Sequence, residues 1–554
     1  MIGIKLKIFD NKVINFQFFN NGNRVIKFNY KNFKIVIIGQ IFENKNEIFK
    51  KIQSSLDKKK LRNLLKLNGE YVLTALNKKD KIYIIGNSQN SYIPVFYVNS
   101  KNNLSVDQNI LNFNSKDYSQ LNLKKMYEWL IFNGRSFNNE TFLTKIKILE
   151  AGSLIIKNKK NLRNYLLPPF IYKPNKMTLN DATRMASNSL KKAINDRIKN
   201  SKGNTQLGLS GGLDSRILAS LVEKNNLSKV TSHTISSKFS FEKKISSIVA
   251  NNLKLNHFQI NVPVKDYYLY AFEAIKFGGF NNVFKHGIYR KFLKRKFKDK
   301  DKYNIMFGNA LDVLIASSYS SRDLKKIRSK KKYINWFKNK YQLFSLKEIN
   351  LIFNDKKIDN KYLYKNFYNS LNKYNFNKNN SIDINDAFTF ETRIKRWHNY
   401  TLSSYSEFIN FLIPTYDQNF LKICSSIPSN LRLRDLLRKN ILKKINSKLY
   451  NLKTSNFLEK TNAKKRAKFK NFYDVNLGFD MKKNNHILKL FYKIKKELAL
   501  LDKDKFLNIN LIEKSILEHK FQDKDISRRI ILMISFLISM ILIFRKQKFK
   551  NEKN

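Results

Sequence analysis

The sequence predicts an α/β domain with a parallel sheet and a helical C-terminal part, preceded by a smaller β-rich domain. Two patterns carry this prediction. Short β-rich runs separated by polar turns fill residues 1–165, whereas strands alternate with helices from about residue 178 onwards, which indicates a parallel sheet with crossover helices. Prolines within residues 168–174 interrupt the pattern between the two parts. We therefore expect one domain at residues 1–165 and a second at residues 178–545.

Composition limits the class of protein. The chain has 554 residues, 42% of them hydrophobic, so a large core can be buried. The net charge of +65 could mark a nucleic-acid binder, but the lysines and arginines are spread along the chain, which argues against nucleic acid as a partner. The single cysteine, Cys424, is expected in the core, and one thiol excludes an internal disulfide. No continuous apolar secretory segment follows Met1, so we expect a cytoplasmic protein.

The first domain is predicted to consist mostly of strands and turns. Three runs are rich in β-branched residues and are bounded by polar residues: 34–39, 71–76 and 81–86. The polar stretch Asn77–Asp80 separates the last two runs. It would join them as a hairpin.

The second domain is predicted to begin with a helix over residues 181–199, followed by alternating elements. The predicted strands are 206–209, 230–235, 258–262 and 303–307, and the predicted helices between them are 216–224 and 241–253. Beyond about residue 320 the chain is expected to be largely helical. The lysine- and asparagine-rich segment 354–380 is expected at the surface, as loop or exposed helix.

One continuous apolar run, Ile530–Phe544, could be a membrane span or a buried helix. A spanning helix needs about 20 apolar residues, and a shorter run is more often a core helix. The run also contains two serines, which suit a packed helix. We therefore expect a buried helix and no membrane partner.

A glycine loop, Ser210–Ser215 (SGGLDS), lies between a predicted strand and a predicted helix. Gly211 and Gly212 let the backbone turn tightly and approach a ligand. Their N–H groups, with a helix N-terminus behind them, form an anion site suited to phosphate. The alternative is that the turn only caps the helix.

The polar side chains of the glycine loop fit the same chemistry. The hydroxyls of Ser210 and Ser215 can donate hydrogen bonds to phosphate oxygens. Asp214 is acidic and should not touch phosphate directly, so its natural role is to hold a magnesium ion that does. The loop differs from the GxxxxGK[ST] pattern, so transfer of the γ-phosphate is not implied.

The glycine loop resembles the PP-loop of ATP pyrophosphatases, and the chain as a whole resembles asparagine synthetases. The further stretches that carry this resemblance are 240–257 (a glutamate-led helix ending near His257), Phe307–Asp312 (the family has SGEGADE), Leu412–Asp417 (the family has PFLD), and 427–454 (a K-x-x-L helix and an R-x-K turn). The resemblance implies an adenine nucleotide α-hydrolase-like fold. It also implies ATP and Mg²⁺ as cofactors and the cleavage of ATP to AMP and pyrophosphate.

By the same resemblance, Lys453 matches the family's catalytic lysine and Lys439 the lysine that opens the preceding helix. Both could equally lie on a solvated face, since lysine is abundant here. Asp312 matches an aspartate near the metal and the substrate, with a simple loop aspartate as the alternative. The implied reaction is adenylation of a small carboxylate followed by attack of ammonia or an amine. Aspartate to asparagine is the family default, and peptide or surface-polysaccharide acids are alternatives.

The chain departs from the family pattern at three positions. Asn309 stands where the family has a glutamate, and an amide cannot act as a base. Val313 replaces a second glutamate, and Arg216 follows the glycine loop where the family usually has serine. These departures put the substrate in doubt more than the ATP chemistry.

Residues 1–165 resemble a class II glutamine amidotransferase domain, on Leu67–Tyr71 and on residues 141–153. Glutamine hydrolysis in that domain needs a cysteine at the mature N-terminus as nucleophile. Ile2 stands there, and Asn87 and Ser88 replace the family's Arg-Asp pair. We therefore expect a degenerate domain and the use of free ammonia or of an amine.

Two other function classes stay open. A PP-loop enzyme that modifies transfer RNA would suit the positive charge, but it would lack the amidotransferase-like domain. A catalytically inactive scaffold relative would keep the fold without the activity. A homodimer is a further possibility on which the sequence does not decide.

Overall fold

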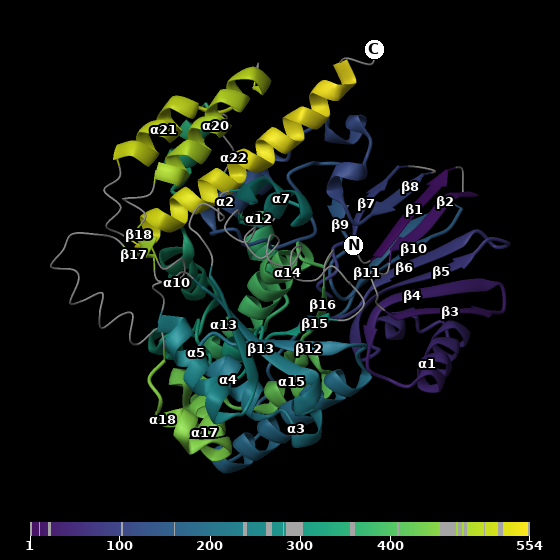
Figure 1. Cartoon of the computed structure of the whole chain (residues 1–554). Coiled ribbons are helices and arrows are strands. Elements are labelled where there is room, and N and C mark those ends of the chain that lie inside the picture. Colours follow the sequence, from purple (N-terminus) through teal and green to yellow (C-terminus); the bar gives the residue numbers. More distant parts are fainter. Residues whose placement is uncertain are drawn as a thin grey trace.

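The computed structural model shows a β-rich domain beside a larger α/β domain, with the C-terminal helices lying across the top of the view (Figure 1). The residues that it describes are 3–9, 12–19, 24–100, 103–159, 161–236, 241–261, 269–280, 282–283, 303–354, 360–406, 409–454, 473–474, 479–480, 485–502, 505–518 and 524–551.

The N-terminal domain contains two antiparallel sheets. The first has the order β11-β10-β6-β5-β4-β3, with bounds Leu162–Leu166, Ser153–Lys157, Ile82–Asn87, Gly69–Asn77, Phe33–Ile41 and Arg24–Tyr30. The second has the order β2-β1-β8-β7-β9, with bounds Lys12–Phe19, Gly3–Phe9, Leu104–Asp107, Phe96–Asn99 and Lys147–Ile148. Alternate residues of both sheets share one core, as expected of a sandwich. The other face of the six-stranded sheet packs on helix α1 (Lys45–Asp57).

The predicted hairpin is confirmed. Strands β5 and β6 pair antiparallel, with Asn77 opposite Ile82. The turn between them is closed by Asn77, whose amide donates to Asp80 at 2.7 Å and whose carbonyl oxygen accepts from the Asp80 backbone at 2.9 Å. Short polar side chains that bond their own backbone are what makes such a stretch a turn.

The predicted parallel sheet of the second domain is confirmed, with the strand order β14-β13-β12-β15-β16. The bounds in that order are Asn256–Asn261, Val230–Ser236, Asn204–Gly208, Tyr303–Met306 and Asn410–Leu412. The first strand in sequence, β12, lies in the centre, and the chain proceeds outward on one side and then on the other. The order therefore reverses between β12 and β15. Ligands bind at such a switch point, outside the carboxyl ends of the strands.

The helices of this domain follow the predictions with shifted ends. Helix α3 spans Leu179–Asn200 and begins at Thr178, whose hydroxyl accepts from the Asp181 backbone. Helix α5 spans Phe241–Asn252. Helix α4 spans Leu213–Ser220, so it begins three residues before the predicted helix at 216 and starts directly at the glycine loop.

The prediction that residues 354–380 form loop or exposed helix is wrong for residues 360–371, whereas residues 372–380 form turns and loop at the surface apart from the buried Tyr374. Helix α12 spans Asn360–Leu371 and buries Leu363, Phe367 and Leu371. These residues recur every four positions and form one apolar stripe. The prediction is based on the many lysines and asparagines of this segment, which do not report the spacing of the apolar residues between them.

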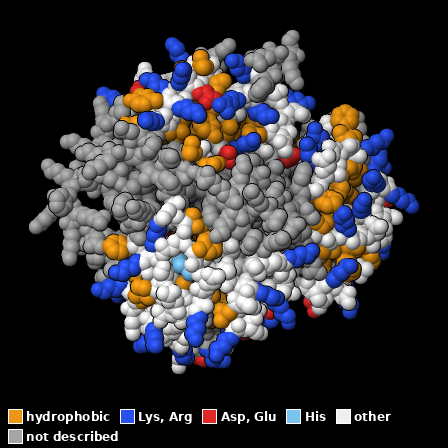
Figure 2. All heavy atoms as spheres, in the orientation of Figure 1, with side chains coloured by type: hydrophobic (Ala, Val, Ile, Leu, Met, Phe, Trp, Pro, Cys, Tyr) orange, Lys and Arg blue, Asp and Glu red, His pale blue; other side chains and the backbone are white. Residues whose placement is uncertain are grey.

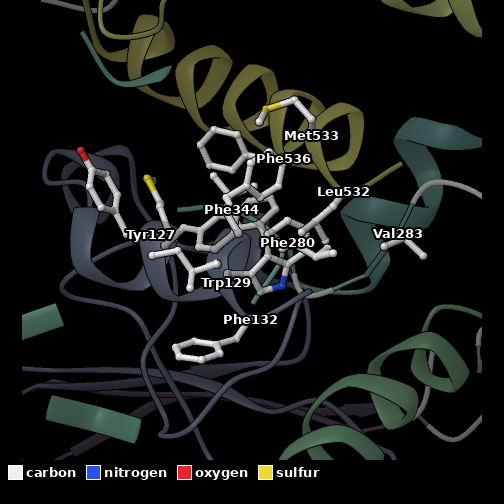
Figure 3. Close-up of a cluster of buried hydrophobic side chains, with 14 of the residues drawn as sticks. Tyr127, Trp129, Phe132, Phe280, Val283, Phe344, Leu532, Met533 and Phe536 are labelled. Atoms are coloured by element: carbon white, nitrogen blue, oxygen red, sulfur yellow. The ribbon is translucent and has the colours of Figure 1, made fainter. Parts of the chain in front are cut away.

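The apolar run 530–544 lies in helix α22 (Lys524–Asn551). By length and composition Arg528–Lys548 could cross a membrane, but 83% of its most apolar window is buried inside the protein. The helix packs on α2 (Leu123–Ile131), α7 (Ala271–Phe277) and α20 (Asn485–Leu501). Figure 3 shows Leu532 and Phe536 of α22 on the side of the helix toward Trp129 and Phe344, and Met533 belongs to the same buried cluster. This burial supports the predicted core helix.

The remaining described helices also lie in the second domain. Apart from the short 3-10 turns, they are α9 (Leu311–Leu314), α10 (Lys330–Tyr341), α11 (Leu346–Ile352), α13 (Ser381–Thr389), η7 (Phe390–His398), α14 (Asn399–Ser403), α15 (Gln418–Ser426), α16 (Ser429–Arg432), α17 (Leu436–Ile445), α18 (Ser447–Asn451) and α21 (Ile509–Glu518). Cys424 lies in α15 and is buried, as predicted, and burial raises the pKa of its thiol.

A buried ion cluster joins the two domains. Arg197 of α3 is fully buried and contacts Glu70 at 3.3 Å and Asp417 at 3.4 Å. The amide of Asn68 donates to Asp417 at 2.9 Å. Asp417 also caps α15 by accepting from the backbone of the next helical turn. The Asn68–Glu70 segment that resembles part of a glutamine site is therefore engaged in the domain interface.

Replacing Phe536 by alanine should cost about 3–5 kcal/mol of unfolding free energy, because the ring is fully buried among Phe142 and Phe353. Leu500→Ala is the matched control, since Leu500 is 66% exposed on α20, and it should stay within about 0.5 kcal/mol of the parent. Denaturant unfolding of both variants checks this. Equal losses would show that α22 is not packed in the core.

The interface cluster also predicts a pH dependence. Burial raises the pKa of Glu70 from 4.5 to about 7, in spite of Arg197. Between these two values the folded state holds a proton that the unfolded state releases, so this carboxyl makes the protein less stable as the pH rises. In Glu70→Gln this contribution is absent. The stability of the variant relative to the parent should therefore rise from pH 4.5 to pH 7, and a constant difference would contradict the burial of a titrating carboxyl here.

Candidate functional site at the sheet switch point

The glycine loop leaves the carboxyl end of β12 and enters α4. Gly211 has φ +70°, in the left-handed region that favours glycine. Gly212 is the N-cap residue of α4, with φ −82°. The backbone N–H of Ser210 donates to the Ser215 hydroxyl at 3.2 Å, and that hydroxyl lies 3.4 Å from the Ser210 hydroxyl. The two predicted serines thus close the loop on itself beside the N-terminus of the helix.

Asp214, in the first turn of α4, is paired with an arginine. Its carboxylate accepts from Arg438 of α17 at 2.8 Å, and the same guanidinium donates to Asp435 at 2.8 Å. The pKa of Asp214 is raised to about 6: burial raises it most and the nearby Asp312 also raises it, whereas Arg438 lowers it. The carboxyl groups of Asp214 and Asp312 are therefore close enough to interact electrostatically.

The approach of α17 to the loop is built on a strained turn. Arg434 and Asp435 both have left-handed backbones, with φ +58° and +63°. Such conformations cost roughly 1 kcal/mol or more for residues other than glycine, and they persist where the surrounding structure requires them. Here the turn lets the Asp435 carboxylate hold Arg438 in place beside Asp214.

The loop after β15 lies against the glycine loop. A side chain at Gly308 would meet the Cβ of Asp214 at 3.3 Å, so the two loops touch there. Ala310, which follows, has φ +71° and caps the short helix α9 that carries Asp312. Burial raises the pKa of Asp312, whereas Arg438 and Arg393 lower it. The switch point thus brings Asp214 and Asp312 together from adjacent strands.

Arg216 ties a third segment to the glycine loop. Its guanidinium donates to the backbone carbonyls of Gly211 at 2.9 Å and of Lys453 at 3.0 Å. It also donates to the carbonyls of Leu449 at 3.0 Å and Leu452 at 2.6 Å. The backbone of Lys453 is therefore held beside the loop, and its side chain is exposed to solvent.

Lys439 lies on the exposed side of α17. Within the described chain, the hydrogen bond of its ammonium goes to the carbonyl of Arg434 at 3.4 Å. Its neighbour Arg438 is the cation that reaches Asp214, and the sequence analysis missed it. The helical phase contained the signal, because Arg438 lies four residues before the buried Leu442, whereas Lys439 lies four before the exposed Lys443.

Asn309 is the centre of a polar network. Its amide donates to the Tyr416 hydroxyl at 2.9 Å, and its side-chain oxygen lies 3.4 Å from Nδ1 of His398. Tyr416 in turn donates to Asn399 at 2.5 Å. His398 ends η7, a π-helical segment, and such segments are frequent at functional sites. The amide that replaces the family's glutamate therefore serves to connect the loop after β15 with η7.

The other departures have structural reasons as well. Val313 is fully buried, so a glutamate there would carry an unpaired buried charge. Asn87 uses its amide to donate to the carbonyls of Ile93 and Leu149, and the Ser88 hydroxyl accepts from the Tyr71 backbone. The positions that correspond to the amidotransferase Arg-Asp pair thus hold the chain in place at the end of β6.

A metal ion would have few protein ligands at the switch point. Among the described residues no group of three or more histidine, cysteine, aspartate or glutamate side chains could hold one. Mg²⁺ in phosphate-binding sites usually takes one or two carboxylates together with phosphate oxygens and water. Asp214 and Asp312 fit that requirement, because both are acidic and their charges interact across the two loops.

The positive charge of the chain does not mark this site. In Figure 2 the lysines and arginines are scattered over the visible described surface and do not gather in one patch.

Comparison with known proteins gives one family match. Residues 185–451 match the model of the asparagine synthase family, a range that includes both loops and Arg438. No curated protein matches the sequence.

Among solved structures, the chain is similar to three synthetases and amidotransferases at low identity. An NH3-dependent NAD synthetase from Campylobacter jejuni shares 16% identity over 36% of this chain and 95% of its own, with a TM-score of 0.18. An NMN synthetase from Francisella tularensis shares 13% identity over 42% of this chain and 97% of its own, with a TM-score of 0.20. A glutamine phosphoribosylpyrophosphate amidotransferase from B. subtilis shares 10% identity over 43% of this chain and 48% of its own, with a TM-score of 0.17. Likenesses this distant say nothing about the chemistry of the chain.

The backbone of the glycine loop predicts different costs for its two glycines. Gly211→Ala must place a side chain at φ +70° and should lose about 1–2 kcal/mol of unfolding free energy. Gly212→Ala is the control, because φ is −82° there and the new Cβ would meet only the Ser210 hydroxyl at 3.4 Å. It should be near neutral. Thermal unfolding of both variants compares them, and equal stability would contradict the loop conformation.

Proposed function

Because residues 185–451 match the asparagine synthase family model, we propose that the protein is an ATP-dependent, AMP-forming ligase that joins a small carboxylate to ammonia or an amine. The observation that supports this most is the convergence of four features at the switch point of the parallel sheet. They are the glycine loop, the Asp214–Asp312 carboxylate pair, Arg438 and the backbone of Lys453.

In the first step, an oxygen of the substrate carboxylate attacks the α-phosphorus of ATP. The bond between that phosphorus and the oxygen bridging to the β-phosphate breaks, and pyrophosphate leaves with the electron pair. The N–H groups of the glycine loop and the N-terminus of α4 would hold the diphosphate. Arg438, and Lys453 by family resemblance, would stabilise the charge that develops on it.

In the second step, the nitrogen of ammonia or an amine attacks the acyl carbon. The bond from that carbon to the phosphate oxygen breaks, AMP leaves, and the nitrogen loses a proton. Asn309 cannot take this proton, because an amide is not a base at neutral pH. The Nδ1 atom of His398 lies 3.4 Å from the side-chain oxygen of Asn309, at the edge of the sheet where the reaction is proposed. Histidine can take up a proton near neutral pH, so His398 is the candidate for this role.

Asp214 and Asp312 would hold Mg²⁺ that arrives with the nucleotide, and the ion would neutralise phosphate charge. Asp214 would then exchange part of its contact with Arg438 for the ion, which leaves the guanidinium available to phosphate. Two carboxylates and one arginine at the same place suit a nucleotide phosphate that carries Mg²⁺, because the carboxylates would bind the ion and the arginine the phosphate.

The nitrogen source is proposed to be free ammonia or an amine. The thiol nucleophile of glutamine hydrolysis is missing at Ile2, a position outside the described residues. Asn68 and Glu70 are engaged with Asp417 and Arg197. Aspartate is the default acid, and the replacement of two family glutamates by Asn309 and Val313 favours a screen that also includes peptide and sugar acids.

ATP–pyrophosphate exchange, screened over candidate acids with Mg²⁺, tests this proposal. One acid should support exchange, and Asp214→Asn should lower the rate by at least about 100-fold. Asp196→Asn is the matched control, since Asp196 lies on the exposed face of α3 and pairs with Lys192, and its rate should equal that of the parent. Ammonium should support amide formation and glutamine should not. Exchange that survives in Asp214→Asn would place the chemistry at another site, and absence of exchange in the parent with every acid would favour an inactive scaffold.

A further inference from the structure

We propose that Arg216 is a positioning residue, whose buried guanidinium fixes the Leu449–Lys453 segment against the glycine loop and so places Lys453 for catalysis. The inference rests on the proposed function for its catalytic part. Its structural part, the anchoring of the segment, stands on contacts within the chain.

The contacts show a cation that is used as a backbone clamp. All four carbonyls that accept from Arg216 are main-chain groups, and they come from two regions more than 200 residues apart in sequence. The Nη1 atom bonds Leu449 and Leu452, and the Nη2 atom bonds Gly211 and Lys453. A planar guanidinium with a fixed fork of donors can hold several carbonyls in one arrangement, which an ammonium cannot do.

The arrangement is energetically demanding. Arg216 is fully buried, and none of its described hydrogen bonds goes to a carboxylate. Burial lowers the pKa of its guanidinium from 12.5 to about 10. A charge without a counter-ion is costly in the interior, and an apolar side chain would fill the same space at a lower cost. A residue kept only for packing would not need this charge.

The location explains what the charge does. Gly211 is the loop glycine with the left-handed backbone, and its carbonyl is turned inward to Arg216. One guanidinium atom therefore bonds both this glycine and Lys453, which ties the Leu449–Lys453 segment to the loop. Leu449 and Leu452 lie at the end of α18, where the carbonyl dipoles favour a nearby positive charge.

The same guanidinium therefore sets two parts of the site relative to each other. The family pattern usually has serine at this position, and a serine side chain is too short to reach α18 and the loop together. Arg216 is therefore the residue by which this chain holds the backbone of Lys453. The side chain of Lys453 is exposed, and the residue follows the short helix α18.

The test compares Arg216→Lys with Lys453→Ala, alone and combined, in the ATP–pyrophosphate exchange assay. Arg216→Lys should lower kcat by about 10- to 100-fold and change the KM for ATP by less than about three-fold, because positioning for the chemical step is lost. In the Lys453→Ala background the same substitution should change the rate by less than about two-fold. Arg216→Gln, which also lacks the charge, should be at least as slow as Arg216→Lys.

Arg197→Lys is the matched control, because Arg197 is an equally buried arginine in the domain interface. Its effect should multiply with that of Lys453→Ala, as expected of an independent structural change. If the effects of Arg216→Lys and Lys453→Ala also multiply, Arg216 does not act through Lys453 and the proposal is overturned.

Hydrogen exchange supplies a readout that does not depend on activity. The amides of residues 449–453 should exchange at least about 10-fold faster in Arg216→Lys than in the parent, and those of α12 should not change. Unchanged exchange in residues 449–453 would overturn the anchoring. If no acid supports exchange in the parent enzyme, the proposed ligase function fails, while this measurement still decides whether Arg216 anchors the segment.

Discussion

The parallel pairing of β12 with β15 is the constraint on which the site depends. Because the two strands run side by side, the loops that follow them must share one edge of the sheet. Their contact is close, since Gly308 leaves no room for a side chain next to Asp214 without displacing it. The glycine loop and the loop that carries Asp312 are thereby brought together although about 100 residues separate them, and the other features of the site are arranged around this junction.

Arginines then fix the surrounding segments to that junction; Arg197 and Arg216 are fully buried, and Arg438 is partly buried. Arg216 holds the end of α18, Arg438 holds Asp214 from α17, and Arg197 holds the N-terminal domain to the start of α15. Each arginine spans a distance between segments that a shorter side chain could not reach across. The Asn68–Glu70 segment of the N-terminal domain is bonded to the second domain. This segment therefore contributes to the scaffold of the second domain.

Much of the fold could be predicted from the sequence because it depends on local patterns. The hairpin at Asn77–Asp80, the alternation from α3 to β14 and the core helix α22 all follow from periodicity and turn residues. The glycine loop could be placed because glycines and a helix start are local features. Helix α12 could not, since composition was weighed instead of the four-residue spacing of Leu363, Phe367 and Leu371.

The long-range contacts of the site were beyond such patterns. Strand β14 begins at Asn256, two residues earlier than predicted, because Asn256 and His257 pair with β13 in spite of their polarity. The family resemblance points to Lys439, whereas the structure brings its neighbour Arg438 to Asp214. The clamp at Arg216 joins residues more than 200 positions apart, and no local signal in a single sequence reports such a contact.

The products of ATP consumption test the central claim most directly. Phosphorus NMR on the parent protein, with ATP, Mg²⁺, ammonium and the acid that supports exchange, distinguishes the two bonds that could break. The account predicts AMP and pyrophosphate in equal amounts, since the loop at β12 would hold the departing diphosphate. Formation of ADP and inorganic phosphate would contradict it.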